Sequence, residues 1–227
     1  MLEQIKKEIE SKENPEKAKI LQRFFKTKKG EYGEGDIFLG IIVPEQRKIA
    51  KNYKNLTLDN LQILLDSKIH EHRLIALIIL VDQFKDNKEN IFNFYLKNTK
   101  NINNWDLVDL TADKIVGEYL RDKDKSILYE LANSNNFWER RISIISTFNF
   151  IKNNQFEDTL KISEILLKDK QDLIHKAVGW MLRELGKRDL ELEESFLKKH
   201  YKTMPRTTLR YAIERFEEEK RLSYLKK

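Results

Sequence analysis

The sequence repeats one helical pattern at a nearly constant interval from residue 68 onward, and this period constrains the fold more than any other feature. Apolar residues recur at three- and four-residue spacing along nearly the whole chain, which predicts helices, and alternation typical of strands is almost absent. The pattern predicts five two-helix units. Their first helices begin near His70, Asn104, Asn136, Gln171 and Pro205, so the spacings between successive starts are 34, 32, 35 and 34 residues. Units of this size cannot bury both faces alone, so they stack. We therefore predict an all-α fold, a right-handed α-solenoid or superhelix of HEAT-like helical repeats.

We expect the 227 residues to form one domain, residues 1–227, in which residues 1–67 supply N-terminal helices and a glycine-rich loop and residues 68–227 supply the repeats. Glycines cluster in KTKKGEYGEGDIFLG (26–40), the one long irregular segment. Local signals predict several helix ends. We expect first-turn prolines at Pro15 and Pro44, N-caps at Asn14 and Thr57, and the end of a helix at Gly186.

Composition excludes several kinds of chemistry. The chain has no cysteine, which excludes disulfides, thiolate metal sites and cysteine nucleophiles. The segment His70-Glu71-His72-Arg73 does not place both imidazoles on one helix face, as the metalloprotease pattern HExxH would. We therefore expect no metal and no cofactor, and we interpret Arg73 as a basic groove residue. Phosphate-loop and nucleophile-elbow patterns are absent as well.

Charge and hydropathy indicate the cellular location of the protein and the kind of partner that it binds. Lys and Arg outnumber Asp and Glu by 43 to 37, which gives a net charge of +6. A modest basic excess is compatible with a polyanionic partner such as nucleic acid, although many basic proteins bind none. The charged N-terminus lacks the apolar core of a secretory signal, and no stretch approaches the ~18 apolar residues of a membrane span. We expect a cytoplasmic protein that does not enter a membrane and is a monomer.

Aromatic and charged residues recur together in the opening helices. Trp105 and Asp109 stand four residues apart and therefore share one helix face. The pair Arg140 and Arg141 opens the next unit. One face of the following unit is expected to carry Lys176, Trp180 and Arg183.

A purely structural reading of these residues stays open. Asp106 can assist a helix N-terminus, and Asp109 can pair with an arginine across a repeat interface. A tryptophan in an apolar helix is more often a core residue than a ligand-binding one, which applies to Trp105 and Trp180 alike.

Six blocks in order resemble the DNA alkylation repair family of AlkD-type glycosylases over nearly the full length. They are FFKTKKGEYGEGDIFLGI (24–41), IHEHRLIALIILV (69–81), NNWDLVDL (103–110), WERRISIISTF (138–148), LIHKAVGWMLRELGKR (173–188) and MPRTTLRYAIE (204–214). The resemblance implies a HEAT-like solenoid that holds alkylated duplex DNA and releases positively charged N3- or N7-alkylpurines. It also implies that Asp109 is the catalytic carboxylate, that Trp105 and Trp180 are the two aromatic site residues, and that Arg141 lies beside the lesion. Some members carry a second aromatic where this chain has Asn104.

The chemistry that the resemblance implies is physically consistent. An alkylated purine carries a positive charge and leaves as a neutral base, so no general acid is needed. An ionised Asp109 can stabilise the cationic sugar and aim a water molecule at it, while the two tryptophan faces attract the cationic nucleotide. The residues expected to hold DNA phosphates are Arg140, Arg141, Lys176 and Arg183, with Arg73, Arg206 and Arg210. The alternative function is a non-catalytic HEAT-like solenoid that binds nucleic acid or a protein partner.

Overall fold

The computed structural model describes residues 1–226, in which the regular structure is helical and no strand is formed. The one β-type contact in this range is an isolated parallel bridge between Ile37 and Ile69. The predicted all-α class is therefore confirmed.

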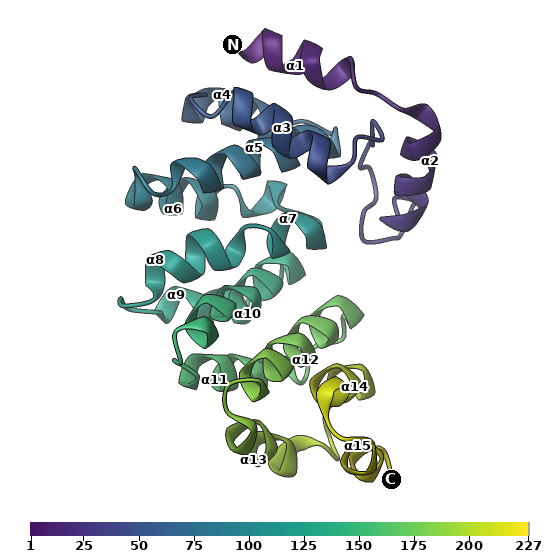
Figure 1. Ribbon diagram of the computed structural model, residues 1–227, viewed down its shortest axis with the longest axis vertical. Helices are drawn as coiled ribbons and strands as arrows, with labels where there is room; N and C mark the ends of the chain where they lie inside the picture. Colours follow the sequence, from purple (N-terminus) through teal and green to yellow (C-terminus); the bar gives the residue numbers. More distant parts are fainter. Residues whose placement is uncertain (227) are drawn as a thin grey trace. The chain divides into compact units, whose positions relative to one another are not determined.

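The chain, whose helices are labelled in Figure 1, divides into two compact units, Met1–Thr111 and a second unit that begins at Ala112. The first unit contains α1 (Leu2–Glu10), α2 (Pro15–Phe24), α3 (Val43–Asn52), α4 (Leu58–Leu65), α5 (His70–Gln83), α6 (Lys88–Lys97), the 3₁₀ turn η1 (Thr99–Asn101) and α7 (Trp105–Asp109). The second contains η2 (Asp113–Gly117), α8 (Glu118–Leu120), α9 (Ser126–Ala132), α10 (Phe137–Lys152), α11 (Glu157–Leu166), α12 (Asp172–Gly186), α13 (Leu190–His200), α14 (Arg206–Ala212), η3 (Ile213–Arg215) and α15 (Glu218–Leu225). The single continuous domain expected from the sequence remains a prediction.

The helix boundaries confirm where the predicted repeat units begin. Helices α5, α7, α10, α12 and α14 begin within one residue of the predicted positions. An asparagine caps the first helix of two of the repeats. The Oδ1 atom of Asn104 accepts a hydrogen bond from the backbone N–H of Trp105 at 2.8 Å, and that of Asn136 accepts one from Trp138 at 3.0 Å. The predicted caps Asn14 and Thr57 are formed as well.

One predicted helix is divided. The pattern of residues 105–120 predicts a continuous helix, whereas the structure has the short α7, the π-helical turn η2 and the short α8. Near the break, the Thr111 hydroxyl donates to the Leu107 carbonyl at 2.5 Å. Within the second unit, Gly117 of η2 is packed so closely that a Cβ there would lie 2.3 Å from the carbonyl oxygen of Ser146. The Thr111 hydrogen bond is local but polar, and the close approach of Gly117 joins residues that are far apart in the sequence. The apolar pattern of the sequence therefore does not reveal the break.

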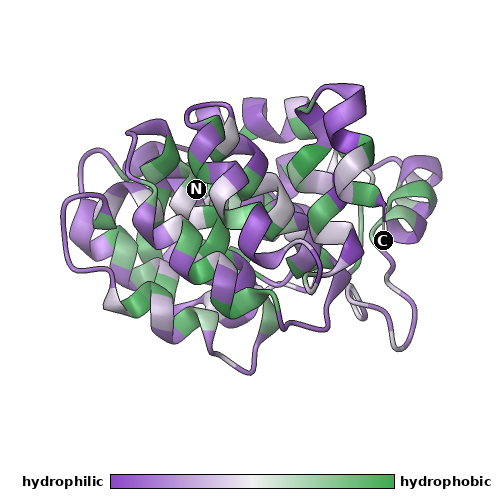
Figure 2. Cartoon of the chain, turned by 90° about the horizontal axis from the view of Figure 1, so that it is seen from below, coloured by the Kyte–Doolittle hydropathy of each residue, from purple (hydrophilic) through white to green (hydrophobic). Residues whose placement is uncertain are grey.

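Each unit has its own apolar core. In the first, α5 is buried along nearly its whole length among α3 and α4. In the second, α10 and α12 form the centre, with α14 packed on α12. Figure 2 shows hydrophobic and hydrophilic residues alternating around the same helices, as expected when one face of each helix is buried. No helix within residues 1–226 is both long and apolar enough to cross a bilayer.

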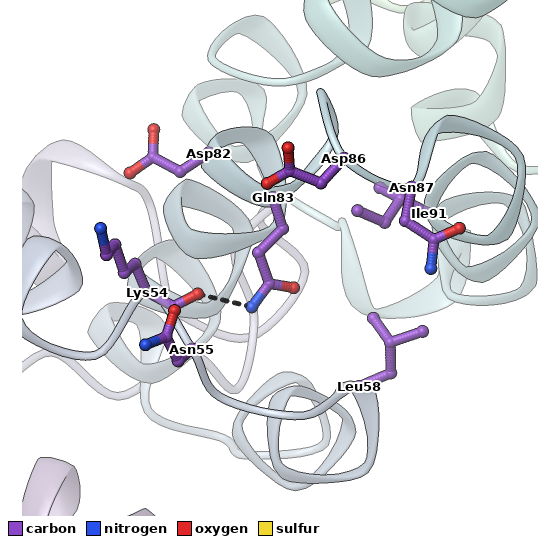
Figure 3. A pocket seen from close by; sticks show the side chains of 8 residues that line it. All are labelled: Lys54, Asn55, Leu58, Asp82, Gln83, Asp86, Asn87 and Ile91. Atoms are coloured by element: carbon purple, nitrogen blue, oxygen red, sulfur yellow. Dashed lines mark hydrogen bonds between the residues drawn. The ribbon is translucent and has the colours of Figure 1, made fainter.

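The first unit also carries a polar pocket of about 410 Å³ beside the α3–α4 connection, the end of α5 and the start of α6 (Figure 3). The side-chain amide of Gln83 donates to the carbonyl of Lys54 at 2.7 Å and closes one side of it. Asp82 and Asp86 line it as well.

Candidate functional site

Helix α7 carries the indole and the carboxylate that the sequence singled out. Its first turn is fixed by Asn104, as described above, and by Asp106, whose Oδ1 accepts from the Leu107 N–H at 2.9 Å. The apolar side of α7, Leu107 and Val108, is fully buried. Trp105 and Asp109 are each only partly buried, so both reach solvent from one short helix.

Trp105 is the outer end of a column of stacked rings. Its indole stacks on Phe25, with ring centroids 5.3 Å apart and planes at 18°. Phe25 stacks on Phe38 at 4.9 Å and 17°, and Phe38 stacks on the imidazole of His70 at 4.4 Å and 19°. Phe24, which is 60% exposed, meets the indole edge-on at 6.1 Å. Stacked pairs of this kind contribute roughly 0.5–1.5 kcal/mol each, so the column holds the indole in one orientation.

His70 ends the column inside a cluster of buried charges. Its Nδ1 lies 3.1 Å from Asp36 Oδ2, and its Nε2 lies 2.8 Å from Asp106 Oδ2. The other oxygen of Asp36 pairs with Arg73 Nη2 at 2.7 Å. Burial acts to lower the pKa of His70, but the Asp106 and Asp36 carboxylates outweigh it and raise the pKa to about 9. Burial likewise acts to raise the pKa of Asp36, yet His70 and Arg73 hold it below its usual value.

The neighbouring Glu71 fixes the end of the glycine-rich segment. Its buried carboxylate accepts hydrogen bonds from the backbone N–H groups of Leu39 at 3.0 Å, Gly40 at 2.8 Å and Ile41 at 3.2 Å. Gly40 has φ +87°, and a Cβ there would lie 2.2 Å from the Asn14 carbonyl oxygen, so only glycine fits.

These contacts correct the expectation for the His70–Arg73 segment. Arg73 is only 5% exposed and is bound to Asp36, because α5 turns this side chain inward to balance the charge of the buried carboxylate. It is therefore not placed to hold DNA phosphates. His72 lies 3.0 Å from the Ser67 hydroxyl, away from the cluster. Among residues 1–226, no group of three or more His, Cys, Asp or Glu side chains is arranged to hold a metal ion.

In the second unit, Trp180 is partly exposed on α12 and is held by two neighbours. Its indole N–H donates to Glu184 at 3.2 Å, and its ring is tilted against Phe148 of α10 with centroids 5.7 Å apart. Lys152 lies 3.9 Å over the Phe148 ring and pairs with the buried carboxylate of Asp113 at 2.7 Å.

The predicted basic residues of the second unit occupy different environments. Arg140 is bound to Asp169, with Nε 2.5 Å from the carboxylate, and its guanidinium also donates to the Ser134 carbonyl at 2.8 Å. Arg141 is 5% exposed and donates to the carbonyl of Leu173. The others are paired on the surface or exposed: Lys176 with Asp172 at 2.8 Å, Arg183 with Glu214, Arg206 with the Leu225 carbonyl at 3.0 Å, and Arg210. Arg140 is thus engaged within the protein, whereas Arg206 and Arg210 face solvent.

Comparison with protein-family models matches residues 5–216 to a family described as DNA alkylation repair enzyme. The chain belongs to this family. Comparison with solved structures finds similar folds in a predicted DNA alkylation repair enzyme from Enterococcus faecalis and in AlkD2 from Streptococcus mutans. The first has a TM-score of 0.74 at 17% identity over 91% of this chain and 98% of that one. AlkD2 has a TM-score of 0.59 at 19% identity over 90% and 99%. No curated protein sequence matches the chain significantly.

For this member of the DNA alkylation repair family, sequence reasoning missed the residues that fix the two tryptophans. Phe25 directly follows α2, and Asp36 and Phe38 lie in the irregular glycine-rich segment, where no periodicity assigns a neighbour. Phe148 could have been found, because it lies seven residues after Arg141 and so shares a stripe of α10 with it.

Proposed function

We propose that this chain is a DNA glycosylase that hydrolyses the N-glycosidic bond of positively charged N3- or N7-alkylated purines in duplex DNA. The observation that carries the proposal is the pairing on α7 of Trp105 and Asp109, an indole and a carboxylate that both reach solvent from one short helix. Membership of the DNA alkylation repair family supports this role.

The proposed reaction needs a stabilised cation and a water molecule. The bond between the sugar C1′ and the purine nitrogen breaks with its electron pair going to the purine, which leaves uncharged. Asp109 stabilises the positive charge that develops on the sugar, and it directs a water molecule whose oxygen forms the new bond to C1′. The water proton passes to the carboxylate or to solvent. No group has to protonate the departing base.

Selectivity in this proposal comes from charge. The faces of Trp105 and Trp180 attract a cationic nucleotide over a neutral one, by roughly 0.5–2 kcal/mol each. The proposed phosphate-binding residues are Arg141, Lys176, Arg183, Arg206 and Arg210. Arg73 and Arg140 are left out, because the carboxylates that bind them, Asp36 and Asp169, are themselves buried. The carboxylates paired with Lys176 and Arg183 are exposed, so phosphates can replace them.

Base release from defined duplexes tests the proposal. A 7-methylguanine duplex and a uracil duplex are incubated with wild-type protein, Asp109→Asn and the matched control Asp122→Asn, whose side chain is exposed. We expect release of 7-methylguanine only, a loss on the order of 100-fold or more in Asp109→Asn with DNA binding kept, and wild-type rates in Asp122→Asn.

Other outcomes contradict the glycosylase assignment. Robust uracil release would show that a cationic leaving group is not required. DNA binding without base release by any of the three proteins would leave the non-catalytic binder as the function.

A further inference from the structure

His70 joins two segments of the first unit that are far apart in the sequence. Asp36 comes from the glycine-rich segment between α2 and α3, and Asp106 from the first turn of α7. The imidazole is 1% exposed and lies between them, so water does not replace either contact. Asn104 adds a weaker link, from its side-chain amide to Asp36 at 3.4 Å.

The hydrogen bonds around His70 require both ring nitrogens to donate. A neutral imidazole carries one N–H, and an ionised carboxylate can only accept. With one N–H, either Asp36 or Asp106 would face a nitrogen lone pair inside the protein. The imidazolium form satisfies both, and its charge together with that of Arg73 balances the two carboxylates.

Two sets of contacts connect the imidazole of His70 with Trp105. Through the rings, His70 packs on Phe25 with centroids 5.2 Å apart, and Phe25 stacks on the indole. Through the backbone, Asp106 is the residue after Trp105 and caps the same helical turn. Any change that releases Asp106 therefore weakens one of the two side-chain caps of the first turn of α7, the other being Asn104.

We propose that His70 is a positioning residue: as an imidazolium it clamps Asp36 to Asp106, and the clamp holds α7 so that Trp105 and Asp109 keep the orientation that the reaction needs. The consequence for activity rests on the proposed function, whereas the clamp itself does not.

The charged groups that face the imidazole determine the pH at which the clamp opens. Asp36 faces it from the glycine-rich segment, Asp106 from α7 and Arg73 from α5 itself, while Phe25 and Phe38 bring no charge. Burial lowers the pKa of His70 and the carboxylates raise it to about 9. Because this folded value lies above the ordinary 6.5, the stabilisation is complete below pH 6.5 and is lost as the pH rises to about 9.

The test follows Trp105 directly. The chain is labelled with 5-fluorotryptophan, and its three ¹⁹F resonances are assigned with single Trp→Phe variants and recorded from pH 6 to 9.5. We expect the Trp105 resonance to titrate with a midpoint near pH 9, while those of Trp138 and Trp180 stay constant. His70→Gln should show no such transition. His72→Gln is the matched control on the same helix, and it should titrate like the wild type.

Kinetics separate positioning from folding. Release of 7-methylguanine, corrected at each pH with the Asp109→Asn protein, should fall toward pH 9 in the wild type. His70→Gln should lower kcat by on the order of 10- to 100-fold with little change in KM. A Trp105 resonance that does not respond between pH 6 and 9.5 overturns the clamp, even if His70→Gln fails to fold. A titrating resonance in a protein that releases no base keeps the clamp and rejects the proposed function.

Discussion

Each unit buries an acidic group whose surroundings differ from those of the other. In the first, Asp36, Arg73 and Asp106 surround His70, and their charges balance. In the second, Glu193 of α13 is 2% exposed, its Oε1 has no hydrogen-bond partner, and its carboxylate packs against Gly186. A compensated cluster fixes geometry, whereas an uncompensated carboxyl simply prefers to be protonated. In the clamp that we propose, the first unit uses charge to orient Trp105, whereas Trp180 of the second unit contacts Glu184 and the ring of Phe148.

Neutralising one buried glutamate in each unit tests whether the two units depend on buried charge to different extents. Glu71→Gln should destabilise the protein by about 3 kcal/mol or more, because an amide cannot accept from three backbone N–H groups as a carboxylate does. Urea unfolding followed by circular dichroism measures it, with the exposed Glu89→Gln as control. A change below about 1 kcal/mol would mean that the glycine-rich segment is held without this carboxylate.

Glu193→Gln should change the free energy of unfolding in the opposite direction, and by a smaller amount, than Glu71→Gln does. Burial raises the pKa of Glu193 to about 8, so the folded chain keeps a proton that the unfolded chain loses from about pH 4.5 upward. Stability therefore falls as the pH rises from 4.5 to 8, and the variant should be more stable than the wild type by about 2 kcal/mol at pH 8 but not at pH 4.5. Urea unfolding at both values, beside the exposed Glu191→Gln, checks the sign. Equal destabilisation at both pH values would contradict it.

The smallest expected effect concerns Trp180. Lys152→Met removes the cation above Phe148 and the partner of Asp113, and the lysine side chain is 42% exposed. We expect a loss of about 1 kcal/mol and a small shift of the Trp180 ¹⁹F resonance. Lys161→Met, whose ion pair with Glu157 is exposed, should change neither. A loss as large as that of Glu71→Gln would show that the second unit also depends on charge for its geometry.

The sequence was sufficient for the helical class and for where the repeats begin, because both follow from local signals. Asn104 and Asn136 mark helix starts by their own side chains, and apolar spacing marks the helices that follow. The positions of Trp105 and Asp109 on one short helix follow from the same periodicity. Their roles stay predictions.

The environment of the charged residues could not be predicted in the same way. The sequence pattern around Arg73 predicts a cation that faces a groove. The structure pairs it with Asp36, which lies in a segment without periodicity and so could not be recognised as its partner. Arg140 likewise depends on Asp169, which lies 29 residues further along the chain, after α11. Whether a charge faces water or the interior is decided by a partner that is distant in sequence, and single-chain patterns do not reveal such pairs.

The cluster around His70 also has a consequence for how the chain acquires its structure. Its hydrogen bonds join residues 34, 36 and 68 positions apart, so three separate stretches must meet before any of them is complete. Closing loops of this size costs entropy that local helix formation does not, and contacts of this kind form late. Stacking of the indole of Trp105 on Phe25 should therefore be among the last events of folding in the first unit, after most helix has already formed.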